Sequence, residues 1–142
     1  MKKNLVKWVL AVVLVGAAVG SFVAYKMWNK EHADATEAEG IKVDAQSLLK
    51  AFQTNETAAN ATYIGKVVEV SGEIGEITSD STPKIILSVP DEMMEGIVVS
   101  IDKRHAEDVA RLKSGDKAVF KGFCSGYLEL SGVIINDAVL MQ

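Results

Sequence analysis

Hydrophobic residues alternate with polar ones from Lys66 onward, and a period of two predicts β-strands. In the first of these segments Val68, Val70 and Ile74 face one way, and charged or hydroxyl residues face the other. Four further segments repeat the alternation: 85–89, 97–101, 117–125 and 133–140. The chain after residue 66 is therefore expected to be mainly β.

Three other segments have helical character. Residues 45–53 place hydrophobic side chains on one face of a short helix, and Asp44 precedes them as an N-cap. A further helical turn is expected at 56–60. Residues 102–112 predict a helix between the third and fourth strands, followed by a Gly-Asp turn.

The expected order is helix, three strands, helix, two strands. This is the order of the five-stranded OB-fold barrel, in which a helix between strands 3 and 4 closes one end. Another small β-barrel, or an open α+β sheet, is the alternative that the pattern leaves open.

An apolar segment precedes these elements. The run from Trp8 to Tyr25 holds 18 residues without a charge, which as a helix is about 27 Å long, close to the thickness of a bilayer core. Aromatic residues such as Trp8 and Tyr25 are common at membrane interfaces. We therefore expect residues 1–28 to be an N-terminal transmembrane helix that acts as an uncleaved signal anchor. Cleavage after Ala35 and a helix buried in the core are the alternatives.

Charge gives this anchor a direction. Lys2, Lys3 and Lys7 precede the run, and basic residues favour the cytoplasmic side. The expected arrangement is a single-pass protein of the inner (cytoplasmic) membrane with its soluble domain outside the cytoplasm, in the periplasm. Residues 29–43 are expected to be a tether and residues 44–142 the OB-fold domain.

The soluble part is acidic. From Glu37 onward the sequence has ten Lys or Arg and seventeen Asp or Glu residues, a net charge of −7. Nucleic-acid binding draws most of its non-specific affinity from cations placed on phosphates. The charge balance therefore disfavours nucleic acid as a partner.

Three stretches resemble a known family. Residues 63–72 (YIGKVVEVSG), 112–126 (LKSGDKAVFKGFCSG) and 133–138 (VIINDA) are similar to strands of the tRNA_anti-like OB-fold family. The resemblance spans about 43–140 and implies a small barrel tethered to the bacterial envelope, with little information on activity. Relatives often carry a second cysteine in the last strand, where this chain has Ala138, so a disulfide to Cys124 is not possible. Many also begin with a lipidated cysteine, which the helix replaces here.

Candidate catalytic groups are few. The two histidines, His32 and His105, are far apart in the sequence, and Cys124, the single cysteine, lies on the inward face of an expected strand. Asp91 and its neighbours form an acidic loop without the spacing of a calcium-binding loop. We expect no enzyme activity, no cofactor and no metal site.

A binding role is expected on the face that OB-folds use, strands 2 and 3 with their flanking loops. None of its outward residues is basic or aromatic, which predicts a protein or envelope-polymer partner rather than single-stranded nucleic acid, the alternative. A second possibility is that the helix at 45–53 covers this face through Leu48, Leu49 and Phe52. The candidate residues are Ile86, Ser88, Met93, Met94, Val98 and Ser100.

Overall fold

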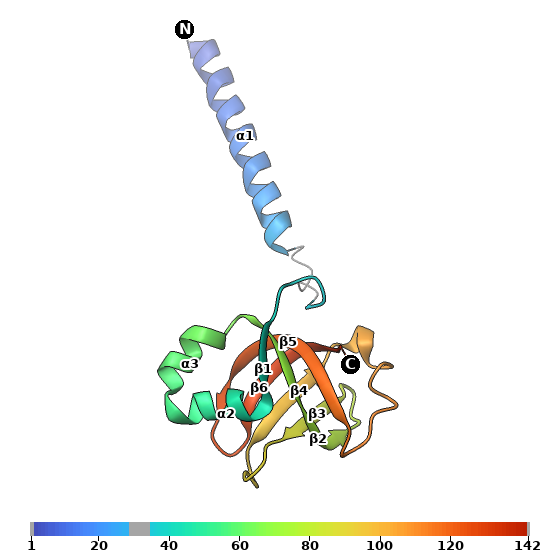
Figure 1. Ribbon diagram of the computed structural model, residues 1–142. Coiled ribbons are helices and arrows are strands. Elements are labelled where there is room, and N and C mark those ends of the chain that lie inside the picture. Colours follow the sequence, from blue (N-terminus) through green and yellow to red (C-terminus); the bar gives the residue numbers. More distant parts are fainter. Residues whose placement is uncertain (1, 29–34, 142) are drawn as a thin grey trace. The chain divides into compact units, whose positions relative to one another are not determined.

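The computed structural model describes residues 2–28 and 35–141 (Figure 1). The chain divides into two compact units, Met1–Ala33 and Asp34–Gln142. The first unit contains one helix, α1 (Lys2–Trp28). Within the described ranges no helix is both long enough and apolar enough to cross a membrane, so the predicted span is not supported.

The two aromatic residues expected at the ends of that span differ in what the structure describes. The side chain of Tyr25 is exposed on α1, whereas the side chain of Trp8 lies outside the described part of the chain. The first residues of the expected tether also lie outside it. Its last residues form a short strand, β1 (Ile41–Asp44), that was not predicted because two hydrophobic residues are too few to establish a period.

Five strands form a closed barrel, which confirms a mainly β, OB-like fold. Their order around the barrel is β2-β3-β4-β6-β5, and pairing of β2 with β5 closes it. Neighbours are antiparallel except β4 and β6, which are parallel, and β1 pairs with β2 in parallel. The strands are β2 (Val67–Thr78), β3 (Lys84–Ser88), β4 (Gly96–Ile101), β5 (Lys117–Leu128) and β6 (Gly132–Leu140).

The helix expected between strands 3 and 4 is not present as predicted. The segment contains only a 3-10 turn, η1 (Lys103–His105), followed by turn residues. Asp102 caps this turn by accepting a hydrogen bond from the Arg104 backbone N–H. Of the apolar residues in the segment 102–112, however, only Val109 is buried. A single buried residue gives too little tertiary packing to sustain a short helix.

The barrel is instead closed by α2 (Ala45–Thr54), which precedes the barrel strands and is followed by α3 (Glu56–Tyr63). Asp44 caps α2, accepting a hydrogen bond of 2.9 Å from the Ser47 amide. Helix α2 contacts β1, β2, β4 and β6, and its buried side chains are Ala45, Leu48, Leu49 and Phe52.

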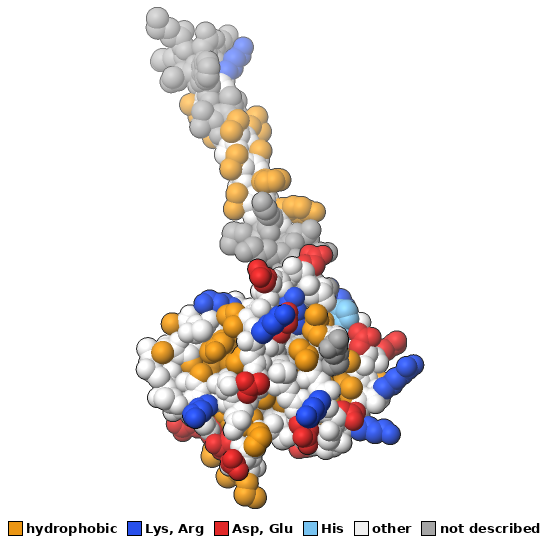
Figure 2. Space-filling model, viewed as in Figure 1, with side chains coloured by type: hydrophobic (Ala, Val, Ile, Leu, Met, Phe, Trp, Pro, Cys, Tyr) orange, Lys and Arg blue, Asp and Glu red, His pale blue; other side chains and the backbone are white. Residues whose placement is uncertain are grey.

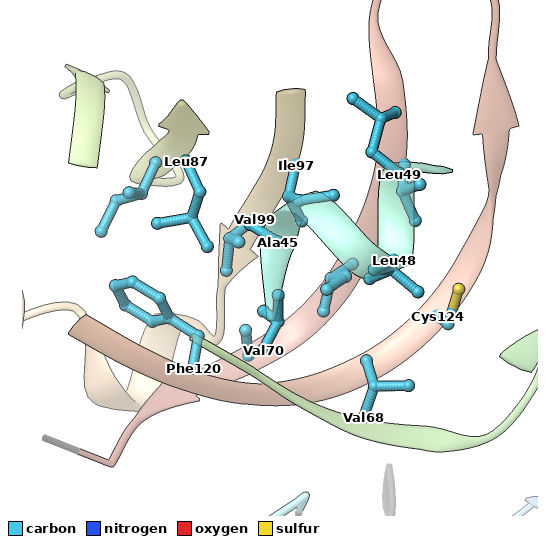
Figure 3. Packing of buried hydrophobic residues seen from close by; sticks show 14 of the residues in the cluster. Ala45, Leu48, Leu49, Val68, Val70, Leu87, Ile97, Val99, Phe120 and Cys124 are labelled. Carbon is cyan, nitrogen blue, oxygen red and sulfur yellow. The ribbon is translucent and has the colours of Figure 1, made fainter. Parts of the chain in front are cut away.

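The interior is continuous from α2 through the barrel (Figure 3). Leu48 and Leu49 of α2 belong to the same core cluster as Leu87, Ile97, Phe120 and Cys124 of the strands. Each of these side chains is at most 1% exposed. The inward positions of the strands are the ones that the alternation predicted. On β3 and β4 the alternate side chains point away from this core.

Candidate ligand-binding face

The outward residues of β3 and β4 form the floor of a groove of about 440 Å³. Such a volume lies within the range of small-ligand sites. Ser100 is not among the lining residues; it pairs with Lys84 in the strand register. The groove therefore unites five of the six predicted residues: Ile86, Ser88, Met93, Met94 and Val98.

Strand register explains why these side chains point outward. Ile86 lies opposite Val98, and their neighbours in sequence face the barrel interior with no exposed surface. Because side chains alternate along a strand, Ile86 and Val98 must face solvent. The parallel pairing of β4 with β6 places Ile134 beside Val98, and Ile134 is likewise only half-buried. An apolar row thus crosses three strands.

Two loops rise beside this floor. In the loop between β3 and β4, Met93 is fully exposed and Met94 is 70% exposed. In the turn between β5 and β6, Leu130 lines the groove and is 67% exposed. Figure 2 shows hydrophobic side chains gathered at the lower tip of the domain, with acidic side chains beside them, where Figure 1 draws the β3–β4 loop.

Helix α2 does not cover the face. Leu48, Leu49 and Phe52 belong to the barrel core instead, which leaves Met93 and Met94 open to solvent. The predicted alternative of a face hidden under this helix is therefore wrong. The reason is that α2 occupies the mouth of the barrel, a position that the sequence assigned to the segment after strand 3.

Glu95 connects the groove's two loops to the rest of the domain. Its Oε2 accepts hydrogen bonds from the Tyr127 hydroxyl at 2.9 Å and from the side-chain amide of Gln53 at 3.0 Å. Its Oε1 accepts one from the Leu130 backbone N–H at 3.3 Å. Hydrogen bonds from Gln53 and then Tyr127 lower the pKa of Glu95. Glu95 thus holds the β3–β4 loop against α2 and the β5–β6 turn.

Tyr127 supports the same junction. Burial, followed by the hydrogen bond to Glu95, raises the pKa of Tyr127 to about 12. Its ring stacks on Phe52 with centroids 5.7 Å apart. The loops that flank the groove are therefore fixed to the core of the domain and are pre-organised for a ligand.

The groove is acidic as well as apolar. Glu76 lies opposite Ile86 in the register of β2 and β3, and Glu92 and Glu95 come from the β3–β4 loop. All three line the groove. No lysine, arginine or aromatic residue is among the described residues that line it. The site can therefore take apolar groups and attract cations.

Chemistry elsewhere in the domain is limited. Burial raises the pKa of the Cys124 thiol to about 11, which disfavours the reactive thiolate. The Nδ1 atom of His105 lies 3.1 Å from Asp108 Oδ2 at the surface. Within 2–28 and 35–141 no group of three or more His, Cys, Asp or Glu is placed to hold a metal ion. His32 falls outside these ranges.

Sequence reasoning missed Leu130, which lines the groove, and Ile134, which extends the apolar row beside Val98. Ile134 could have been found from the sequence, because the third and fifth strands of an OB barrel, here β4 and β6, pair in parallel. Leu130 stands alone in a turn, and nothing in the local pattern separates it from an ordinary exposed leucine.

A closed five-stranded barrel with this strand order and an open face on its second and third strands is an OB-fold. The chain belongs to the tRNA_anti-like family, whose model matches residues 1–139. This confirms the resemblance noted in the sequence.

The barrel is also similar to a solved structure. A crystallised protein of Klebsiella pneumoniae subsp. pneumoniae, provisionally described as a nucleic acid-binding lipoprotein, matches with a TM-score of 0.54 and 17% sequence identity. The match covers 71% of this chain and 92% of the other. A similarity at this identity shows the fold alone. No curated protein matches the chain. The neighbour's description does not support our expectation that nucleic acid is disfavoured.

Proposed function

We propose that this chain is a non-catalytic binding module that holds a protein partner in the groove between β3 and β4. One observation carries the proposal: the surface on which OB-folds take their ligands is here an open apolar groove lined by Ile86, Val98, Met93 and Met94. Exposed apolar surface with flexible methionines is typical of protein-contact sites. An envelope polymer, which would also lie outside the cytoplasm, is the alternative partner for the same groove.

Single-stranded nucleic acid is the second candidate function. The family and the provisional description of the Klebsiella protein favour it. Against it stands the lining of the groove, because single-stranded binders combine cations with stacking aromatic rings, and here the charged residues that line it are Glu76, Glu92 and Glu95.

We further propose that the domain acts outside the cytoplasm at the inner membrane. The support comes from the sequence: three lysines precede the uncharged run at 8–25, and lysines flank membrane spans on the cytoplasmic side. Since no helix in the described ranges qualifies as a span, attachment needs its own test. Extraction of membranes with alkaline carbonate should leave the chain in the pellet, and external protease should digest residues 35–141 in spheroplasts. Release into the supernatant, or resistance to protease, would contradict the proposal.

Site-specific photocrosslinking in intact cells tests the binding function. A photoreactive amino acid at Val98 should give an adduct that protease destroys and nuclease leaves intact. The same amino acid at exposed Lys103, on η1, provides the control and should not give that adduct. A nuclease-sensitive adduct at Val98 would favour the second candidate, and no adduct specific to Val98 would refute the groove as the binding face.

A further inference from the structure

We infer that the groove selects a polypeptide segment in which an apolar residue is flanked by lysine or arginine. This inference rests on the proposed function and specifies the chemistry of the partner. It depends on two independent features of the groove, its apolar floor and its uniform negative charge.

The floor is suited to an inserted apolar side chain. Ile86 and Val98 lie side by side on β3 and β4 and are half-buried, and Ile134 on β6 continues this apolar row next to Val98, outside the groove lining. Met93 and Leu130 stand beside them and are largely exposed. Covering these residues removes apolar surface from water, which favours binding.

Carboxylates lie at both sides of this floor. Glu76 comes next to Ile86 on the β2 side, and Glu92 comes from the loop that follows β3. Both are exposed. Glu92 Oε1 accepts one hydrogen bond, from the Gln53 side-chain amide at 3.2 Å, so a cation would pair with Glu92 through Oε2 and with Glu76 through its carboxylate. Glu95 has a different role, because its oxygens already accept three hydrogen bonds that fix the loops.

An extended chain supplies matching groups at simple spacing. Residues two apart in an extended segment point to the same side, so a basic residue two positions before and after an apolar one would face the groove with it. The same carboxylates would repel a nucleic-acid phosphate or an anionic lipid headgroup at short range. Charge complementarity therefore favours the polypeptide over both.

Fluorescence anisotropy on the purified full chain tests the inference. The probe is a fluorescein-labelled peptide, Lys-Ser-Leu-Ser-Lys-Ser-Leu-Ser-Lys. One matched peptide replaces every Lys by Glu, and another replaces every Leu by Ser. We expect the first peptide to bind at least about tenfold more tightly than either matched peptide, with affinity that falls as salt is added.

Variants connect this preference to the groove. The double substitution Glu76→Lys and Glu92→Lys should weaken binding of the lysine peptide at least about tenfold. Glu107→Lys, a single reversal on the exposed turn after η1, should leave it within about twofold. Val98→Asp should also weaken it, and circular dichroism of each variant checks folding. If Val98→Asp unfolds the domain, the exposed double variant alone decides.

Several results would overturn the inference. Two concern the peptides: the glutamate peptide binds as tightly as the lysine peptide, or the double variant keeps the affinity for the lysine peptide. Two concern other ligands: a dT12 oligonucleotide, or vesicles of anionic phosphatidylglycerol, bind more tightly than the lysine peptide. The last is self-association of the chain that Val98→Asp abolishes. A protein adduct at Val98 in cells without any preference for the lysine peptide would refute this inference and leave the proposed function intact. No adduct at Val98 would refute the proposed function itself.

Discussion

Replacing Leu48 by alanine should destabilise the domain strongly, because this side chain extends from α2 into the core of the barrel. Leu48 has no exposed surface and packs among core residues of the strands. The substitution removes three buried carbons at about 0.8 kcal/mol each, or roughly 2.4 kcal/mol. The cavity left behind adds to this, so we expect a loss of about 3 to 4 kcal/mol in the free energy of unfolding.

Pulse proteolysis of the full chain across a urea series measures this loss. Tryptophan fluorescence would not serve, since Trp8 and Trp28 both belong to α1. Leu130→Ala makes the same chemical change at a residue that is 67% exposed, and it should alter the free energy of unfolding by less than about 0.5 kcal/mol.

The comparison between the two alanine variants decides the outcome. If Leu48→Ala costs no more than Leu130→Ala, helix α2 is not part of the barrel core, and the closure described above is incorrect. A loss of the expected size with an unchanged urea dependence would mean that α2 and the barrel unfold together.

Three further predictions concern acid, thiol chemistry and backbone conformation. Hydrogen bonds from Arg104 lower the pKa of Asp102 from 3.8 to about 2. The stability that the Asp102 carboxylate contributes is therefore present above pH 3.8 and is lost as pH falls toward 2. When the urea midpoint is measured across this pH range, Asp102→Asn should flatten its decline. Ellman's reagent at pH 8 should label Cys124 only after unfolding, because the thiol is buried and its pKa is raised to about 11; rapid labelling of the native chain would contradict its burial. Gly132→Ala should lower the urea midpoint several times more than Gly115→Ala. The angle φ is positive at both glycines, but of the two only Gly132 would place a Cβ 1.8 Å from a backbone oxygen. Equal losses would contradict the close approach of β4 and β6.

The strands were predictable because alternation is a local property with a strong physical cause. Val68, Val70 and Ile74 face the core as their spacing indicates. Closure of the barrel was harder, because it depends on which segment occupies its mouth. Both 45–53 and 102–112 show helical spacing, but only the first has enough large apolar residues to be held by packing, and the second collapses into η1 and turns.

The candidate site was partly predictable for the same reason. Ile86 and Val98 follow from alternation once the strands are placed, and the exposure of Met93 and Met94 follows from their position in a loop. The role of Glu95 could not be read from the sequence. Its partners are 32 to 42 residues distant in the chain, and only the fold brings them together.

The most direct test of the groove is methyl NMR of the full chain with labelled methionines, using the lysine-leucine peptide as ligand. Met93 and Met94 line the groove, whereas Met141 follows the last strand, lies outside the groove and is also partly exposed, so it serves as an internal control. We predict that the methyl resonances of Met93 and Met94 shift on titration while that of Met141 stays in place. Shifts confined to Met141, or binding without any shift at Met93 and Met94, would show that the ligand binds elsewhere.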